Sequence, residues 1–372
     1  SIGRTDYMIL TSVAAVTVAI IYTTAIDVSD TPDTYPTQVA APEVVANSVA
    51  VMPFVIMSDN ADNEDFSDGL SDTLLHMLAQ VPDLRVSART SSFAFKGQDQ
   101  DIREIARALG VAHILEGSVQ RAGGRVRITA QLIRAEDGFH VWSENYDRTL
   151  EDVFGIQDEI AQLVSKSMTL SLRGSNGGRI IEGVGTTNIE AYDFYLKALS
   201  IQAKSSHGAL KEAEALLKEA LAIDADFLDA KTQLAVNYFN QLQTGLRAHD
   251  ATLIEIEALL EQVLASRPED VRARSWHQVA RVRRAFLGGE QVDWAAITEE
   301  THAITSEAPI EIDPKLLLAE LLIATHHHEE ALQLMQEVLI LDPLNPASHY
   351  SIGHFYRSLE DWDKAKLSYE RS

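Results

Sequence analysis

The most constraining feature of this sequence is a helical pattern with a period of 34 residues near the carboxyl end. Ala331 and Ala365 are one period apart, and other apolar positions keep the same spacing. The matched pairs are Ile312 with Pro346, Leu318 with Ile352, Ala319 with Gly353, Leu322 with Tyr356, and Met335 with Tyr369. A period of this length indicates one helix pair per repeat, and each pair buries its apolar face only by stacking on its neighbours. The pattern therefore predicts a helical array.

These repeats resemble tetratricopeptide (TPR) repeats, in which small residues such as Ala319 and Gly353 let two helices approach closely. Pro343 lies where that motif ends a repeat. Residues 228–268 fit the motif with an insertion, residues 192–225 resemble an opening repeat, and residues 271–309 are degenerate. The resemblance implies an all-α TPR solenoid over residues 188–372 whose last repeat is incomplete. We expect further repeats, or a partner, to cover its exposed end.

The composition excludes several classes of function. A chain of 372 residues, 46% of them hydrophobic, predicts two or more domains. Because 55 Asp and Glu face 31 Lys and Arg, the net charge of -24 repels phosphate backbones, and we expect no nucleic acid to bind. The sequence has no cysteine, which excludes disulfides, thiolate metal sites and a cysteine nucleophile.

A mixed pattern over residues 49–173 predicts an α+β domain with helices over one face of a small sheet. Alternation of apolar Val126, Ile128 and Leu132 with polar residues is typical of a half-buried hairpin strand. We expect strands at 48–54, 84–87, 111–120, 125–134 and 140–146, and helices at 66–80, 101–110 and 151–172. Asp68 or Ser71 is expected to cap the first helix, and Gly110 to end the second.

Five segments of this domain carry a resemblance to a known family. They read VAVMPF, DFSDGLSDTLL, LRVSARTSSFAFKG, DIREIARALGVAHILEGSVQRAGGRVRITAQLI and HVWSENYDRTLEDVFGIQDEIA. The domain resembles the TolB amino-terminal-like domain that precedes TPR repeats in many bacterial proteins. The resemblance implies an interaction module without known catalysis. It also implies membrane-anchored signalling proteins with a winged-helix or adenylate cyclase output domain, neither of which this sequence contains.

The segment 7–26 has no charged residue and is long enough to cross a bilayer, so it predicts a single transmembrane helix. A cleavable signal peptide is the alternative. Arg4 precedes this segment and Asp27, Asp30 and Asp33 follow it, which predicts a cytoplasmic flank at 1–6 and a periplasmic bulk of the chain. We thus expect a single-pass protein of the bacterial inner membrane. Pro-rich residues 27–48 and Gly-rich residues 174–187 are expected linkers.

We find no catalytic motif, and we expect no enzyme activity, no cofactor and no metal. A calcium loop over Asp59–Asp68 and a metal site at His326–His328 are weaker alternatives to a solvated loop and a polar turn. An enzyme acting on peptidoglycan or nucleotides is a third class, for which no acid, base and nucleophile set can be placed. The four tryptophans, Trp142, Trp276, Trp294 and Trp362, are expected to be packing residues.

The first helices of TPR repeats line a concave groove, and matching the motif predicts a protein-binding groove here. Phe239 and Tyr350 are its aromatic anchors, although both also fit packing between repeats. The predicted groove residues are Asp229, Thr232, Val236, Phe239, Asn240, Asp313, Leu316, Glu320, Ile323, Ala347, Tyr350, His354 and Arg357.

A second candidate surface is a basic stripe on one helix face, formed by Arg274, His277, Arg281 and Arg284. Pairing with Glu255, Glu257 and Glu261 is one interpretation, and docking of an acidic partner is the other.

We therefore predict a non-enzymatic, membrane-anchored periplasmic interaction module, the sensory or scaffold part of a single-pass signalling protein. The alternative is a structural accessory subunit of a bacterial envelope membrane complex. The partner, the signal and the oligomeric state are not predicted.

Overall fold

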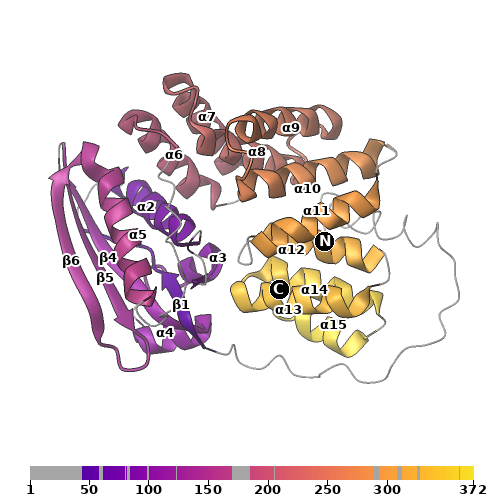
Figure 1. Ribbon diagram of the computed structural model, residues 1–372, viewed down its shortest axis with the longest axis horizontal. Coiled ribbons are helices and arrows are strands. Elements are labelled where there is room, and N and C mark those ends of the chain that lie inside the picture. Colours follow the sequence, from indigo (N-terminus) through magenta and orange to yellow (C-terminus); the bar gives the residue numbers. More distant parts are fainter. Residues whose placement is uncertain are drawn as a thin grey trace, which may run out of the picture.

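The computed structural model describes residues 44–57, 62–79, 81, 84–98, 100–122, 124–169, 185–204, 206–288, 293–307, 312–324, 327–359 and 361–372. These residues form a sheet with flanking helices and a curved array of helices beside it (Figure 1). The predicted transmembrane segment 7–26 lies outside the described residues.

The sheet is mixed, with strand order β3-β1-β4-β5-β6 and β2 paired with β4. β1, β2 and β3 run parallel to their neighbours, whereas β4, β5 and β6 form an antiparallel meander. The expected strand 48–54 corresponds to β1, which begins earlier and ends before Pro53, and a second short strand, β2, follows that proline. The strands are β1 (Val45–Val51), β2 (Val55–Ile56), β3 (Arg85–Val86), β4 (Val111–Ala122), β5 (Arg125–Arg134) and β6 (His140–Thr149).

Helices cover both faces of this sheet, whereas the sequence predicted helices on one face. In β1, Val49 and Val51 point into the main core and Ala50 points into a second cluster with Ile105 and Leu109. Because successive strand residues face opposite sides, an apolar run like β1 needs cover on both. The helices are α2 (Asp62–Ala79) and α5 (Val153–Thr169) on one side, α4 (Ile102–Leu109) on the other, and the short α3 (Arg89–Phe93) and η1 (Leu150–Asp152).

Two local predictions about helix ends have different outcomes. Asp101 caps α4 through Arg103 N, and Gly110 ends it with φ of 66°, so that helix is confirmed. The capping role of Asp68 or Ser71 is wrong, because α2 already begins at Asp62. Ser71 Oγ instead accepts a hydrogen bond from Phe54 N (2.9 Å), which ties α2 to the chain after β1.

The fold class and localisation predicted from segment 7–26 are corrected. Among the helices of the described ranges, none combines the length and apolar character needed to span a membrane. The described residues therefore form a mixed-sheet domain followed by a helical array, with no membrane-spanning helix among them, and the single-pass inner-membrane localisation is withdrawn.

The helical array confirms the predicted TPR repeats. Its described helices form five successive pairs, and the stretch 271–309, degenerate in sequence, supplies one of them. The last two pairs keep the predicted period, since α12 and α14 start at 312 and 346 and α13 and α15 at 328 and 362, each 34 residues apart. The bounds are α6 (Ile189–Gln202), α7 (His207–Ile223), α8 (Leu228–Gln243), α9 (His249–Ser266), α10 (Val271–Gly288), α11 (Trp294–Glu307), α12 (Ile312–Ala324), α13 (His328–Leu341), α14 (Pro346–Ser358) and α15 (Trp362–Tyr369).

The first repeat packs directly against the sheet domain. α6 lies against α2, where Gly69 leaves room for the backbone of Leu196 (Figure 1). The buried Tyr192 hydroxyl donates to Thr73 Oγ1 (3.2 Å), and Arg121 pairs with Asp193 (2.8 Å). One continuous core therefore runs from Val49 in β1 to Ala280 in α10.

The array also touches the domain a second time, near its other end. Ser91 of α3 donates to Asp342 Oδ1 from its main-chain N (3.1 Å) and from Oγ (2.6 Å). Ala88 N donates to Leu341 O (3.0 Å), and Arg85 Nη2 donates to Ile340 O (2.9 Å). Asp342 is 1% exposed. The fourth repeat is thus fixed to the β3–α3 segment, and the array and the domain form a closed ring (Figure 1).

Replacing Gly69 with alanine should destabilise the α2–α6 contact. A Cβ at this position would lie 2.6 Å from Leu196 Cβ and 2.9 Å from its Cα, so the two helices must separate. We expect a loss of about 1–3 kcal/mol in the free energy of unfolding, measured by chemical denaturation. Gly155→Ala in α5 is the matched control, since its Cβ meets nothing within 4 Å, and should be neutral or stabilising. Equal effects of both variants would contradict the close contact.

Removing the Asp342 carboxylate should open the ring. Hydrogen exchange should accelerate by roughly tenfold or more at the Ala88 and Ser91 amides, because both donate across the contact and a hydrogen bond to a charged group contributes about 1.5–3 kcal/mol. Ser91→Ala should reproduce part of the effect from the other side. Glu136→Ala, at an exposed turn, is the control. Unchanged exchange at both amides in Asp342→Ala would show that the contact does not hold the ring closed.

Candidate interaction surfaces

The predicted groove residues of α8 are used largely in packing between repeats. Thr232, Val236 and Phe239 are buried. The Phe239 ring lies 5.1 Å from the Trp276 ring of α10, in an edge-on contact. Asp229 accepts from Gly185 N (3.1 Å) and pairs with Arg267 (2.8 Å). Asn240 is half-buried. This part of the groove offers little free apolar surface, and its role in binding stays a prediction.

The α12 part of the predicted groove is more open. Leu316 and Ile323 are half-buried and pack at the margin of the cluster formed by the last two repeats. Glu320 is exposed. Asp313 and Ala347 belong to α12 and α14, but their side chains lie outside the described part of the chain.

The α14 part brings its predicted residues together. Tyr350 is 36% exposed, and its ring lies 4.5 Å from His354 and 5.7 Å from Tyr369 of α15. Gly353 permits this, since a Cβ there would lie 2.7 Å from the Tyr369 ring. Burial lowers the pKa of His354, and the charge of Arg357 lowers it further, so the imidazole is neutral at pH 7. Arg357 is exposed at the end of this cluster.

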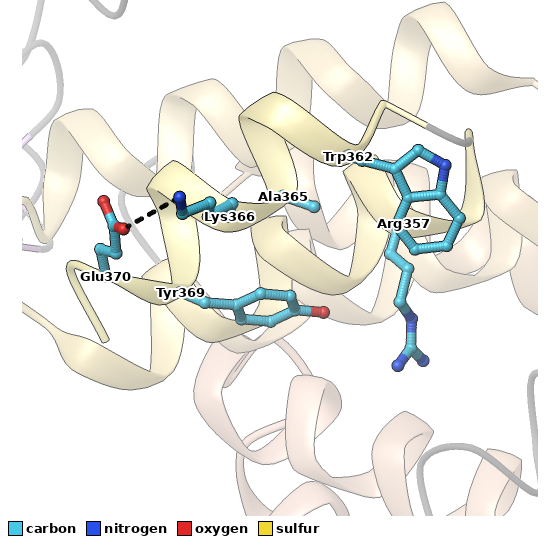
Figure 2. Close-up of a pocket in the computed structure, with 6 residues that line it drawn as sticks. All are labelled: Arg357, Trp362, Ala365, Lys366, Tyr369 and Glu370. Carbon is cyan, nitrogen blue, oxygen red and sulfur yellow. Dashed lines mark ion pairs between the residues drawn. The ribbon is translucent and has the colours of Figure 1, made fainter.

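An open hollow of about 320 Å³ adjoins the cluster (Figure 2). Trp362 and Arg357 lie on one side, the Lys366–Glu370 pair (4.0 Å) lies on the other, and the Tyr369 ring lies between them. Ala365 forms part of the lining. The Tyr369 hydroxyl is buried and has no hydrogen-bond partner among the described residues. We name the connected set the terminal-repeat surface: Tyr350, His354, Arg357, Trp362, Lys366 and Tyr369.

Two of the four tryptophans that were expected to pack are exposed. Trp294 is 36% exposed, and Trp362, which adjoins the hollow, is 65% exposed. Asp361 caps α15 through Lys364 N, which places Trp362 in the first turn, on the helix face that also carries Ala365 and Tyr369. The cap immediately before this tryptophan is the sequence signal that could have revealed its exposure.

The basic stripe is paired within the array. Arg274 pairs with Glu307, Arg281 with Glu300 (3.5 Å) and Arg284 with Glu257 (2.8 Å). His277 is half-buried, and burial, aided by Arg281, lowers its pKa. Of the three acids expected as partners, Glu255 pairs instead with Arg247 (2.9 Å). Intramolecular pairing accounts for these contacts, and docking of an acidic partner on the stripe stays a prediction.

In the two segments considered as metal sites, the acidic residues that the structure describes contact protein side chains. Asp65 accepts from Ser200 Oγ (2.7 Å), and Asp68 pairs with Lys96 (2.6 Å). Burial raises the pKa of Asp68, opposed by Lys96. Asp59 and His326 lie outside the described residues. Within those residues, no group of three or more metal-binding side chains is present.

Comparison with known proteins gives one family match and one curated relative. Residues 45–163 match the family described as HilA/YgeH-like transcriptional regulator, second domain. Putative adenylate cyclase 3 of Rhizobium meliloti (strain 1021) is 40% identical over 191 residues, which cover 51% of this chain and 32% of that protein. The chain thus spans about a third of the length of this curated relative, at 32%. The TolB-like assignment of the sheet domain stays a prediction.

Two solved structures are similar to about half of the chain. MamA, residues 41 to the end, from Desulfovibrio magneticus RS-1 is 16% identical, with 49% of this chain and 92% of that chain covered and a TM-score of 0.33. TTC0263, a thermophilic TPR protein of Thermus thermophilus, is 15% identical, with 49% and 89% covered and a TM-score of 0.39. Similarity at this level carries no functional conclusion.

Proposed function

We propose that this chain is a protein-interaction module that binds a partner through the terminal-repeat surface. The observation that carries the proposal is the exposure of Trp362 and Tyr350 beside Arg357 at one hollow. Aromatic and arginine side chains are the commonest anchors of protein interfaces, and surfaces of this kind are rarely left exposed without a function. Binding is the proposed activity, and no catalytic step is assigned to the chain.

The surface suits a segment that carries both an apolar and an acidic side chain. Trp362, Ala365 and Tyr369 offer apolar contact within the hollow. Arg357 and Lys366 add positive charge at its margin, in a chain whose net charge is otherwise -24. A helix or extended peptide with an aromatic or aliphatic residue next to Asp or Glu meets these demands.

We further propose that the module is the sensory or scaffold part of a signalling protein. Two similarities support this role. One is the regulator family matched by residues 45–163, and the other is the putative adenylate cyclase that shares 40% identity with half of the chain. The ring leaves the terminal-repeat surface in a fixed position relative to the sheet domain, so binding at the repeats is mechanically connected to that domain.

Selection of a random peptide library on the immobilised full chain tests this function. Selected peptides should combine an apolar anchor with Asp or Glu. Tyr350→Ala with Arg357→Ala should weaken their binding by about tenfold or more, as loss of interface anchors does, while the helical content by circular dichroism is retained.

A triple change of Arg274, Arg281 and Arg284 to alanine is the control, because those side chains are paired within the array. If only the triple change abolished binding, the basic stripe would be the interface and the terminal-repeat surface would be excluded.

A further inference from the structure

Strand β6 leaves one edge of the sheet open. The strand order places it last, beside β5, and Figure 1 shows it as the outermost strand. Among the described residues no strand pairs with its other side. Long edge strands are normally protected by proline, by lysine or by a bulge. β6 spans ten residues and contains neither proline nor lysine, and the irregularity in its pairing with β5 lies between His140 and Trp142, away from its centre. Its edge is therefore available for pairing.

The register with β5 fixes which main-chain groups of β6 point outward. Leu150 N donates to Gly124 O (2.9 Å), so these two residues form a hydrogen-bonded pair. Hydrogen-bonded and non-hydrogen-bonded pairs alternate along an antiparallel ladder. The main-chain N–H and C=O groups of Tyr146 therefore point toward β5, and those of Asn145 and Asp147 point toward the open edge.

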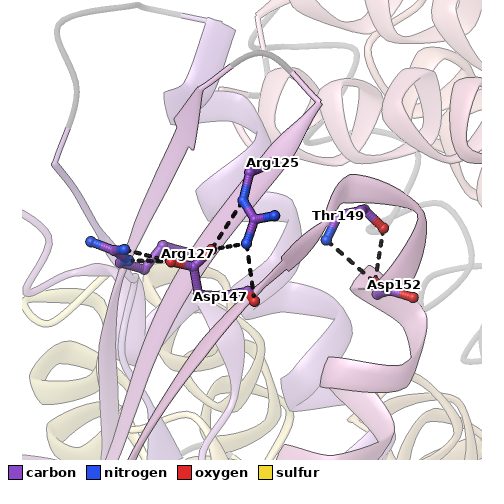
Figure 3. Close-up of polar contacts among 5 residues, drawn as sticks. All are labelled: Arg125, Arg127, Asp147, Thr149 and Asp152. Atoms are coloured by element: carbon purple, nitrogen blue, oxygen red, sulfur yellow. Dashed lines mark hydrogen bonds and ion pairs between the residues drawn. The ribbon is translucent and has the colours of Figure 1, made fainter.

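Two contacts agree with this assignment (Figure 3). Thr149 N donates to Asp152 Oδ2 (3.3 Å) and not to β5, which closes the edge at that end. The Asp147 carbonyl accepts only a long hydrogen bond from the Arg125 side chain (3.4 Å). A partner strand can replace that bond with a main-chain one.

The sequence of β6 is complementary to itself when it is reversed about Tyr146. In an antiparallel pair centred there, Glu144 lies opposite Arg148 of the second copy, and Asn145 lies opposite Asp147. Opposed charges stabilise antiparallel pairs, and here the pair of Glu144 with Arg148 occurs twice because of the two-fold symmetry.

The charged side chains are free to make these contacts. Glu144 is exposed and makes no ion pair with another described residue. Arg148 is exposed and 3.3 Å from Glu159, a surface pair of small energetic value. On the other face of the sheet, Arg125 and Arg127 both pair with Asp147 (Figure 3). The Asp147 charge is therefore already balanced, and the neutral Asn145 of the second copy can lie opposite it.

Other registers are less favourable. Centring the pair on Glu144 or on Arg148 sets like charges directly opposite each other. Centring it on Asn145 leaves Glu144 opposite Tyr146 and forms no opposite-charge pair. Among these registers, the one centred on Tyr146 alone sets opposite charges directly opposite each other.

We propose that the chain forms a symmetric homodimer by antiparallel pairing of β6 with β6 of a second copy, centred on Tyr146. The sheet then continues across the two-fold axis. Asn145 and Asp147 of the second copy exchange main-chain hydrogen bonds, and the two Tyr146 residues form a non-hydrogen-bonded pair. This interface is separate from the terminal-repeat surface, and it does not depend on the proposed function.

Charge reversal tests the register in the full chain by sedimentation equilibrium over a range of concentrations. Glu144→Arg and Arg148→Glu each convert two opposite-charge pairs into two like-charge pairs, and each should raise the dimer dissociation constant by about tenfold or more. The double variant Glu144→Arg with Arg148→Glu restores both pairs and should restore dimerisation. A chain that stays monomeric at all concentrations, or a double variant no better than the single ones, would overturn the proposal.

Asn145→Pro separates edge pairing from folding. Its N–H points to the open edge, so proline should leave the β5–β6 ladder and the melting temperature nearly unchanged while abolishing the dimer. A dimer that persists in this variant would place the interface elsewhere.

Discussion

The close packing of α2 against α6 is the contact on which the rest of the architecture depends. Gly69 brings the two helices together, and the buried Tyr192 hydroxyl contacts Thr73 across them. Because this contact fixes the first repeat, the stacking of each following pair determines where the last repeats lie. The array then returns to the domain at Asp342, where Ser91 supplies two hydrogen bonds to one buried carboxylate. A solenoid that would otherwise flex along its length is held at two points.

The closed ring has its second contact, at Asp342, close to the terminal-repeat surface. Tyr350, Trp362 and Arg357 follow the loop that contains Asp342, so the second anchor is adjacent to the proposed binding surface. β3, next to the Asp342 contact, is at one edge of the sheet, and the open edge of β6 is at the other. The proposed partner and the proposed second copy would therefore occupy different surfaces of the chain. A signal read at the repeats could reach a dimer through the sheet domain.

The local elements were largely predictable from sequence, because period and capping act over a few residues. Asp101 and Gly110 defined α4, and the 34-residue period placed the last four helices. The long-range contacts were not predictable. Nothing about Gly69 signals that Leu196 lies against it, and α3, whose Ser91 reaches Asp342, was not expected at all. In the candidate site, the predicted groove residues Tyr350, His354 and Arg357 do lie together on α14. Two other residues differ from the prediction: Phe239 packs on Trp276, and Trp362 is exposed.

The closed ring is the central claim, and a distance measurement tests it most directly. The chain has no cysteine, so spin labels can be attached at Arg107→Cys in α4 and Asp363→Cys in α15, both exposed positions. Pulsed dipolar spectroscopy, with labelled chain diluted in unlabelled chain, should give one narrow distance distribution. The same distribution should broaden and shift to longer distances when Asp342→Ala is added. A broad distribution in the unaltered background would contradict the ring and leave the array joined to the domain only through α2 and α6.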